Sequence, residues 1–491
     1  MNRLLIAAGV ASLWLSACAV GPNYVAPAPP APPNQAFAAA TPEAASAEAP
    51  PDGWWKLYDV PALDALVQQA LTHNKNLLVA AANLSRARGA LALARSNEFP
   101  STELAAGAQY GVSSTELEEN ALTGKTGAPQ PQWLYTAGLD ASYEVDLFGR
   151  VRRAVAAAKA DVQAQQAAED AVRISVAGET TRAYVNACAY AQELTVARQS
   201  LDVVTQTYDV TVRQARDGAA SDLDVARAAE QASQIRATLP GFEGQRRAAL
   251  FELAVLTGDP PEQISADADA CAAPPKLAAA LPVGDMQSLF RRRPDVRQAE
   301  RQLAADVNRI GVATADLYPT ISIGLSAESA SNKVSGLGSI NNLSYLGGPL
   351  LSWSFPNTLV AVAEIREAKA TASADYASFQ GTVLQALQDV EEAMTNYANE
   401  LARNHALVAA RDQSQTAFNL AQAQYDHGRI SYLDLLTAQS DLVHNQAALA
   451  DSDQQLASDQ VTLFKALGGG WEQAPPIAPL PMPGGGIAPR G

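Results

Sequence analysis

The sequence predicts a mixed α and β membrane protein, in which an outer-membrane β-barrel shared between protomers, with four strands per chain, continues into a long, coiled-coil-like α-helical part. Three observations support this fold class. Two helical patterns are too long for one globule, four segments alternate apolar and polar residues, and the turn pattern G-x-x-S-x-L-D occurs twice. The copies, Gly218 to Asp224 and Gly428 to Asp434, each join two helical patterns, which indicates two tandem structural repeats.

The long helical patterns contain no proline from Val151 to Arg216 or from Thr358 to Asp426. At 1.5 Å per residue, each could reach about 100 Å. Helices that run out and back past each turn form two hairpins, with tips at 217–224 and 427–434. The first return helix is expected to be interrupted and bent at Pro240, because proline removes a backbone donor. A coiled-coil-like packing is indicated by leucines that recur every seven residues, Leu435, Leu442, Leu449, Leu456 and Leu463.

Four segments have the period of two that is typical of strands with one wet face. They lie at about 101–112, 133–147, 319–329 and 343–355, and the last is the weakest because it contains Gly347-Gly348-Pro349. Strands of roughly ten residues with one apolar face are the signature of an outer-membrane barrel. Four strands cannot close a barrel, and an open edge in lipid leaves backbone groups unsatisfied. Several chains are therefore expected to contribute one sheet each.

The N-terminus predicts a secreted protein with a lipid anchor. Asn2 and Arg3 precede an apolar run that ends in Leu15-Ser16-Ala17-Cys18, the order of a secretory signal peptide. The ending resembles the lipobox of bacterial lipoproteins, which implies that residues 1–17 are removed and that Cys18 carries lipid. The alternative is an ordinary cleaved signal with an incidental cysteine. No other apolar run is expected to reach the roughly 20 residues of a spanning helix, so any crossing must use strands.

Two cysteines remain after Cys18. Neither Cys188 nor Cys271 has the spacing of a metal site or of a C-x-x-C motif, and Cys188 falls in a helical pattern. The sequence predicts a buried structural thiol rather than a disulfide. No metal or other cofactor is expected, since the four histidines show no ligand spacing.

Charge and motifs exclude two classes of function. The chain has 35 Lys and Arg against 51 Asp and Glu, a formal charge of −16, whereas a nucleic-acid partner needs a basic face. No nucleophile elbow, phosphate loop or paired-carboxylate motif has supporting context. The protein is therefore expected to bind no nucleic acid and not to be an enzyme.

The predicted organisation follows the chain in six parts. They are the signal peptide 1–17, a Pro- and Ala-rich tether 18–52, the first repeat 53–258, an inter-repeat linker 259–292, the second repeat 293–470 and a Pro- and Gly-rich tail 471–491.

Several motifs together resemble the TolC-type outer membrane factors, specifically the lipoprotein branch that serves multidrug efflux pumps. They are Leu15 to Cys18, Gly21-Pro22-Asn23-Tyr24, Tyr143 to Arg150 and Arg292 to Glu300. The resemblance spans essentially the whole mature chain. It implies a homotrimer whose strands form one barrel of about twelve strands in the outer membrane, continued by a helical periplasmic tunnel. Substrates would pass from an inner-membrane pump through a periplasmic adaptor (membrane fusion) protein.

The resemblance also assigns roles to the hairpin tips, where acidic residues and a tyrosine form an aperture that opens like an iris. Asp224 and Asp434 match the acidic gate positions and Tyr425 matches the tyrosine. A link such as Tyr425 to Asp224 would hold the hairpins together. The family's inner hairpin often has an arginine two residues after the turn glycine, but here Ile430 stands there and Arg429 precedes it. The tip residues expected to contact the adaptor are Gly218, Ser221, Leu223, Gly428, Ser431 and Leu433.

The same tip residues also suit a purely structural role. Ser221 to Asp224 and Ser431 to Asp434 each spell S-x-x-D, close to a capping box, and turn glycines suit helix C-termini. Asp224 and Asp434 therefore have two open interpretations, as gate and as cap. Arg291-Arg292-Arg293 is interpreted in the same structural way, as the end of one segment, with Asp295 capping the next helix.

Two other functions are compatible with the pattern. The first is an outer-membrane duct for type I protein secretion, which the same architecture could serve. The second is a periplasmic adaptor that uses helical hairpins without forming a pore. The transported substrate is not specified by the sequence.

Overall fold

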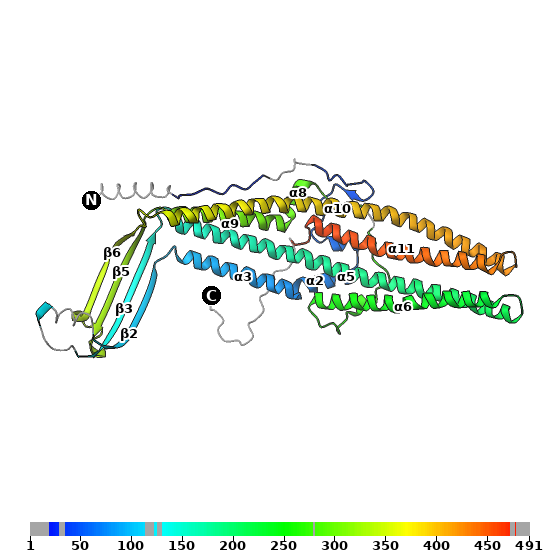
Figure 1. The fold of residues 1–491 in the computed structure, drawn as a ribbon, viewed down its shortest axis with the longest axis horizontal. Coiled ribbons are helices and arrows are strands. Elements are labelled where there is room, and N and C mark those ends of the chain that lie inside the picture. The colour runs from blue at the N-terminus through cyan, green and yellow to red at the C-terminus, as the bar shows by residue number, and fades with distance from the viewer. Residues whose placement is uncertain are drawn as a thin grey trace. The chain divides into compact units, whose positions relative to one another are not determined.

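A computed structural model of the protein describes residues 19–28, 35–112, 122–124, 130–277, 280–471 and 477 (Figure 1). The predicted signal peptide, Cys18 and nearly all of the predicted tail lie outside the described residues. The chain divides into two compact units. The sheet unit comprises Met1–Pro27, Ser85–Ala164 and Ala299–Phe379, and the hairpin unit comprises Ala28–Leu84, Gln165–Gln298 and Gln380–Gly491.

The sheet unit contains one antiparallel sheet in the order β2-β3-β5-β6. The strands are β2 (Ser101–Gly111), β3 (Gln132–Val145), β5 (Thr320–Ser331) and β6 (Leu343–Ser352). The fourth strand thus ends at Ser352, not near Phe355 as the sequence suggested. Pro349 cannot donate a backbone hydrogen bond, and it lies in the one of these strands that follows β5 at the end of the sheet order, with a partner on one side only within the described part of the chain.

The N-terminal motif docks inside the sheet unit. The Val20 amide donates to the Phe148 carbonyl at 3.0 Å, and Arg153 Nη2 donates to Asn23 Oδ1 at 2.8 Å. The Tyr24 hydroxyl donates to the Glu300 carboxylate. These contacts join three of the segments that carry the family resemblance. In this stretch the segment predicted as a tether therefore lies against the fold through specific partners.

The sheet unit also holds parts of four helices that continue into the hairpin unit. They are α3 (Lys75–Ser96), α5 (Arg150–Arg216), α9 (Pro294–Ala315) and α10 (Leu359–Asp426). Inside this unit α5 and α9 bury small residues against each other, Ala160, Ala304 and Ala305.

Helix α3 corrects one prediction. By length and composition it could cross a membrane, with a mean hydropathy of 1.2 over its most apolar window. The expectation that no segment other than the N-terminal one qualifies is therefore wrong, because alanine and leucine raise the average despite Arg86 and Arg88. One such helix is weak evidence for a span, since core helices pass the same test.

The hairpin unit contains two helical hairpins, α5 with α6 (Asp222–Thr257) and α10 with α11 (Tyr432–Leu467) (Figure 1). Its core includes α2 (Pro61–His73) and the stacked rings of Trp54 and Phe464, whose centroids are 4.7 Å apart. Both return helices end at a glycine in the left-handed region, Gly258 and Gly468. Leu435 and Leu463, from the seven-residue repeat, are fully buried.

Helix α6 continues through Pro240 without a break, so the predicted interruption is wrong. Pro240 is exposed, and the carbonyl that loses its partner four residues earlier can therefore bond to water. The Thr238 hydroxyl donates to the Ile235 carbonyl at 2.8 Å and satisfies a further backbone acceptor in this turn.

Cys188 and Cys271 form a disulfide, contrary to the prediction of a free buried thiol. Their Cα atoms are 5.1 Å apart although 83 residues separate them in sequence. Cysteine spacing and helical periodicity around Cys188 give no sign of this bond, because it depends on the linker. The linker folds back onto the helical core through buried Ala268 and Leu281. A disulfide is consistent with an oxidising compartment.

Residues 35–52, in the segment predicted as an extended tether, are attached to the linker and to α10. Strand β1 (Ala45–Ser46) pairs in parallel with β4 (Leu281–Pro282). Phe37 is buried, and the amides of Ala38 and Ala39 each donate to the Glu391 carboxylate at 2.8 Å. The linker also contains α7 (Ala266–Asp269) and α8 (Met286–Arg292).

Candidate functional site

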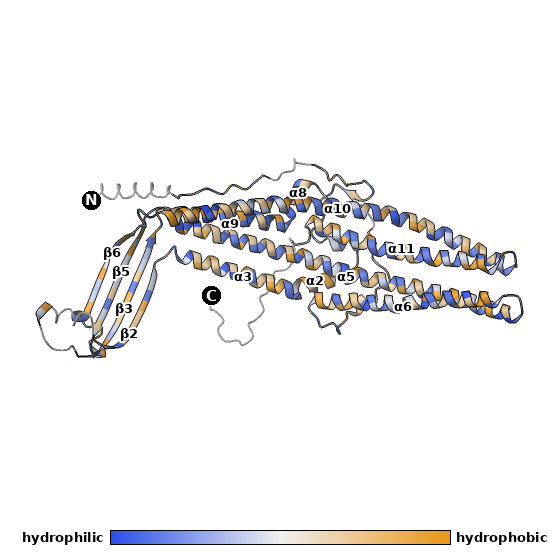
Figure 2. Cartoon of the chain, viewed as in Figure 1, coloured by the Kyte–Doolittle hydropathy of each residue, from blue (hydrophilic) through white to orange (hydrophobic). Residues whose placement is uncertain are grey.

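One face of the sheet is apolar from edge to edge. Residues on successive strands align in one row, in which Leu104 lies opposite Leu139, Leu139 opposite Ala327, and Ala327 opposite Tyr345. Figure 2 shows apolar and polar residues alternating along these strands. Leu104 and Tyr345 are each 80% exposed. A soluble sheet would bury such a face, so this one is suited to contact lipid.

The opposite face of the sheet is mostly polar and acidic on β2, β3 and β5, whereas Leu346 and Leu350 of β6 share it. Glu103 lies directly opposite Asp140, and Glu328 opposite Gly138. The four strands contain no Lys, Arg or His. A water-filled lumen lined by this face would favour cations over anions.

The two hairpin tips have the same backbone construction. Gly218 and Gly428 end the outgoing helices with φ of +76° and +68°, a conformation that glycine adopts without strain. Nothing lies within 4 Å of a Cβ built on either glycine. Only their backbone conformation therefore requires glycine at these two positions.

Each tip then closes with a complete capping box. At the first tip Ser221 Oγ accepts from the Asp224 amide at 3.2 Å, and Asp224 Oδ2 accepts from the Ser221 amide at 3.1 Å. At the second tip the corresponding distances between Ser431 and Asp434 are 3.3 and 3.0 Å. The hydrogen bonds from Ser431 lower the pKa of the Asp434 carboxyl. The capping interpretation therefore holds for both carboxylates.

Tyr425 connects the two hairpins, but not to the predicted partner. Its hydroxyl donates to Gln214 Oε1 on α5 rather than to Asp224. One oxygen of Asp224 is already held at 2.7 Å by the Ser221 hydroxyl, which leaves it poorly placed for a second link. No sequence signal singled out Gln214, because a glutamine on a helix near a turn is ordinary.

Tyr432 is a tip residue that sequence reasoning missed. It is 7% exposed, and its ring meets that of Tyr425 edge-on, with centroids 5.9 Å apart. Burial raises the pKa of both phenols, so both are neutral at physiological pH. The sequence did contain a signal for this residue, because the two tips differ at this position, which is Asp222 in the first tip and Tyr432 in the second.

The remaining tip residues are exposed. Leu223 and Leu433 are 58% and 49% exposed, which makes them available for contact with another protein. The side chain of Arg429 is exposed and has no ion-pair partner among the described residues, so it does not neutralise either capping carboxylate.

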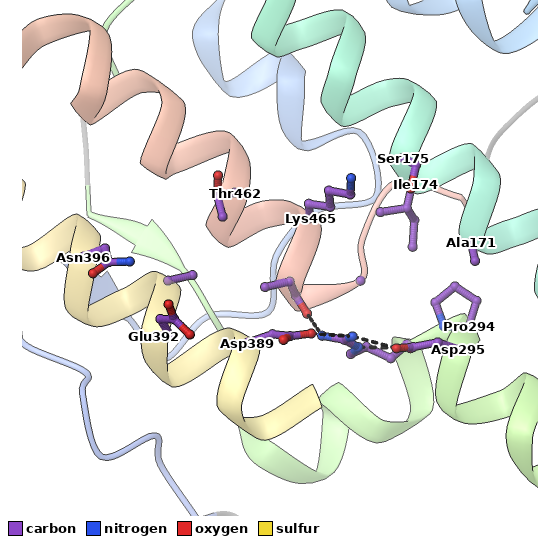
Figure 3. A pocket seen from close by; sticks show the side chains of 14 residues that line it. Ala171, Ile174, Ser175, Pro294, Asp295, Asp389, Glu392, Asn396, Thr462 and Lys465 are labelled. Atoms are coloured by element: carbon purple, nitrogen blue, oxygen red, sulfur yellow. Dashed lines mark hydrogen bonds and ion pairs between the residues drawn. The ribbon is translucent and has the colours of Figure 1, made fainter. Parts of the chain in front are cut away.

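A second concentration of charge lies at the corner between α8 and α9. Arg293 donates to Asp295 at 2.6 Å, to Asp389 on α10 at 2.9 Å and to the Ala466 carbonyl on α11 at 3.0 Å (Figure 3). Burial lowers the pKa of this guanidinium, but the hydrogen bonds to both aspartates outweigh burial and raise it. Arg293 thus connects α9, α10 and α11 through its hydrogen bonds.

This corner borders a cavity of about 380 Å³ that Lys465 and Glu392 also line. Arg293 is engaged by carboxylates, and Lys465 lies 3.4 Å from Glu179, so neither offers a free cation. Asp295 lies inside the first turn of α9, where its carboxylate accepts from the Val296 amide at 3.0 Å. The corner therefore stabilises the fold, but the prediction that Asp295 is the N-cap of this helix is wrong, because α9 already begins at Pro294.

Within the part of the chain that the structure describes, no group of three or more His, Cys, Asp or Glu side chains is arranged to hold a metal ion.

Comparison with known proteins gives consistent matches along the chain. The family described as outer membrane efflux protein matches residues 66–259 and 286–469. Nodulation protein T of Rhizobium leguminosarum bv. viciae is 30% identical over 487 residues, which cover 97% of this chain and 96% of that protein. The antibiotic efflux pump outer membrane protein ArpC of Pseudomonas putida is 29% identical over 482 residues, covering 96% of each.

A solved structure has the same fold. The outer-membrane channel OprN superposes with a TM-score of 0.85 at 31% sequence identity, covering 92% of this chain and all of that one.

Proposed function

Because the chain belongs to the outer membrane efflux protein family, we propose that three copies of it form one channel, to which each copy gives its four strands. The protein is an outer membrane efflux channel and not an enzyme. The observation that carries the proposal is the sheet, whose apolar face is continuous while its edge strands β2 and β6 each pair on one side only within the described residues. An unpaired edge is untenable in lipid, so neighbouring sheets must pair.

The rest of the assembly follows from the same premise. The long helices form a tunnel through the periplasm, and lipid on Cys18 anchors the N-terminus in the outer membrane. The exposed tip residues, Leu223 and Leu433 among them, contact a periplasmic adaptor that couples the tunnel to an inner-membrane pump. The acidic inner face of the sheet makes the passage favour cations.

The cargo we propose is a small toxic molecule such as a drug. The similarity to a protein named as an antibiotic efflux component supports this choice over type I protein secretion. A pore-free adaptor is not retained, because the chain matches a family of channels along both repeats.

The tip forms the gate, and the hydrogen bond from Tyr425 to Gln214 holds it closed. The capping boxes keep each tip rigid, so the hairpins separate as units when this hydrogen bond breaks. Asp224 and Asp434 then serve as caps and present a carboxylate oxygen toward the pore axis at the same time.

Gene deletion tests the function directly. The gene is removed together with each candidate pump, and sensitivity to a panel of drugs is compared with that of the pump deletion alone. We expect increased sensitivity to several small molecules. The wild-type gene should restore resistance, whereas a variant that combines Cys18→Ala with deletion of residues 101–145 should not. Unchanged sensitivity in every pump background would rule out drug efflux.

A further inference from the structure

A cavity of about 530 Å³ lies in the hairpin unit between α5, α6 and α11. This volume is in the range of sites that hold a drug-sized molecule. It is separate from the tips and from the Arg293 corner, since it shares no lining residue with either. None of the sequence motifs accounts for it.

The wall of this cavity is largely apolar. Val196 on α5, Ile235 and Phe242 on α6, and Val443 on α11 line it. Ile235 also belongs to a small hydrophobic cluster with Val204 and Ala232, against which Val443 packs. A flat or hydrocarbon-rich molecule would gain from burial here.

Glu193 lies in this wall with nothing to neutralise it. Its side chain is 8% exposed, and it has no hydrogen-bond or ion-pair partner among the described residues. The charge that acts on it is that of Asp451 on α11, which is also acidic. Burial, together with Asp451, raises the pKa of Glu193 to about 7. A buried carboxylate without a partner is costly, which makes this position receptive to a cation.

No lysine or arginine lines the cavity. His444 on α11 is the one lining residue that can become positive, and α6 contributes only uncharged side chains such as Gln231 and Gln234. The Asp451 carboxylate also forms an ion pair with Arg403, whose Nη2 lies 3.6 Å from Asp451 Oδ2. The net character of the site is therefore acidic and apolar.

We propose that this cavity is a binding site for an amphiphilic organic cation, with Glu193 as its counter-ion and Phe242, Ile235 and Val443 enclosing its apolar part. A molecule seated there contacts α5 and α6 of the first hairpin and α11 of the second. It therefore bridges the two hairpins at a distance from the gate. The inference concerns binding alone and does not depend on transport.

Ethidium is a suitable probe, because its charge is permanent and its size fits the cavity. Fluorescence anisotropy of ethidium is measured with the purified full-length protein in maltoside detergent at pH 8. We expect saturable binding that Glu193→Gln weakens about tenfold or more, since an ion pair to a buried carboxylate is lost. The matched control Glu252→Gln removes an exposed glutamate of α6 outside the cavity and should leave binding unchanged.

Two further measurements distinguish binding in this cavity from nonspecific adsorption of ethidium. Phe242→Ala should weaken binding while preserving the oligomer, checked by size-exclusion chromatography for every variant. Lowering the pH from 8 to 6 should weaken ethidium binding to the wild type about tenfold, because protonated Glu193 is neutral. Glu193→Gln should show a clearly smaller pH dependence than the wild type, because only His444 and Asp451 then remain as titratable lining residues.

Three outcomes would overturn the proposal. They are the absence of saturable ethidium binding, equal binding by Glu193→Gln and the wild type, and equal binding of the anionic dye fluorescein. A loss of affinity in Glu252→Gln as large as in Glu193→Gln would also contradict it, because general surface charge would then explain the binding.

Discussion

The two hairpin tips have nearly the same backbone but differ in their aromatic residues. Both have a left-handed glycine followed by a capping box, with matching distances at Ser221 and Ser431. Only the second tip adds Tyr425 and Tyr432, and only there does a side chain cross to the other hairpin. The shared residues build the turn, whereas the unshared residues connect the hairpins. Repeated motifs therefore indicate structure, and the proposed gate is expected where the repeats differ.

The largest effect is expected at the position that differs most between the tips. Tyr432→Ala removes a buried aromatic ring and should cost about 3–5 kcal/mol of local stability. Asp222→Ala, at the equivalent position of the first tip, is exposed and should cost less than about 0.5 kcal/mol. Hydrogen exchange of tip amides measures both. Equal protection in the two variants would contradict the asymmetry.

The second asymmetry is the disulfide, which joins α5 of the first repeat to the linker and has no counterpart at the matching position of the second repeat. Cys188 and Ala398 stand at the same distance before their turn glycines, so the second repeat has alanine where the first is cross-linked. Replacing both Cys188 and Cys271 by alanine should lower stability by roughly 2–5 kcal/mol through the unfolded state. Thermal unfolding with and without reductant checks this. The reductant should shift the wild type but not the double variant.

A smaller effect separates capping from gating at the second tip. Ser431→Ala and Asp434→Ala each remove the capping box and should lower the hydrogen-exchange protection of the tip amides about fivefold. If Asp434 also gates, only Asp434→Ala should raise single-channel conductance in planar bilayers, because Ser431→Ala keeps the carboxylate. Equal conductance in both variants, with normal oligomers, would leave capping as the sufficient role.

The smallest effect is the pH response of the second cap. The pKa of Asp434 is lowered by Ser431, so its contribution to stability is present above the unfolded pKa of about 3.9 and is lost as pH falls through the folded value. Exchange of the Asp434 amide between pH 5 and pH 2.5 should report this loss. In Ser431→Ala the loss should begin at higher pH. An identical profile in both proteins would show that the hydroxyl has no influence.

The elements could be predicted because their signals are local. A period of two located strands close to β2, β3, β5 and β6, and proline-free heptad patterns located α5 and α10 to within one residue at either end. Glycine followed by S-x-x-D located both turns and their caps. Each of these patterns depends on which face of a single helix or strand is polar and which is apolar. The spacing of residues in one sequence shows this directly.

The contacts between distant segments could not be predicted in the same way. The disulfide joins residues 83 apart, and the Tyr425 link depends on which glutamine of α5 lies opposite. Residues 35–52 look like a free Pro- and Ala-rich tether until their pairing with Leu281–Pro282 is seen. The error at Pro240 had another cause, since solvent exposure of the helix decides whether proline breaks it.

The central claim is that one chain supplies one part of a channel that only several chains can close. Native mass spectrometry of the detergent-purified protein, followed by planar-bilayer recording of the same sample, tests it most directly. We predict a complex of three chains that conducts ions with a preference for cations. A stable single chain that conducts alone, or a three-chain complex without conductance, would contradict the claim.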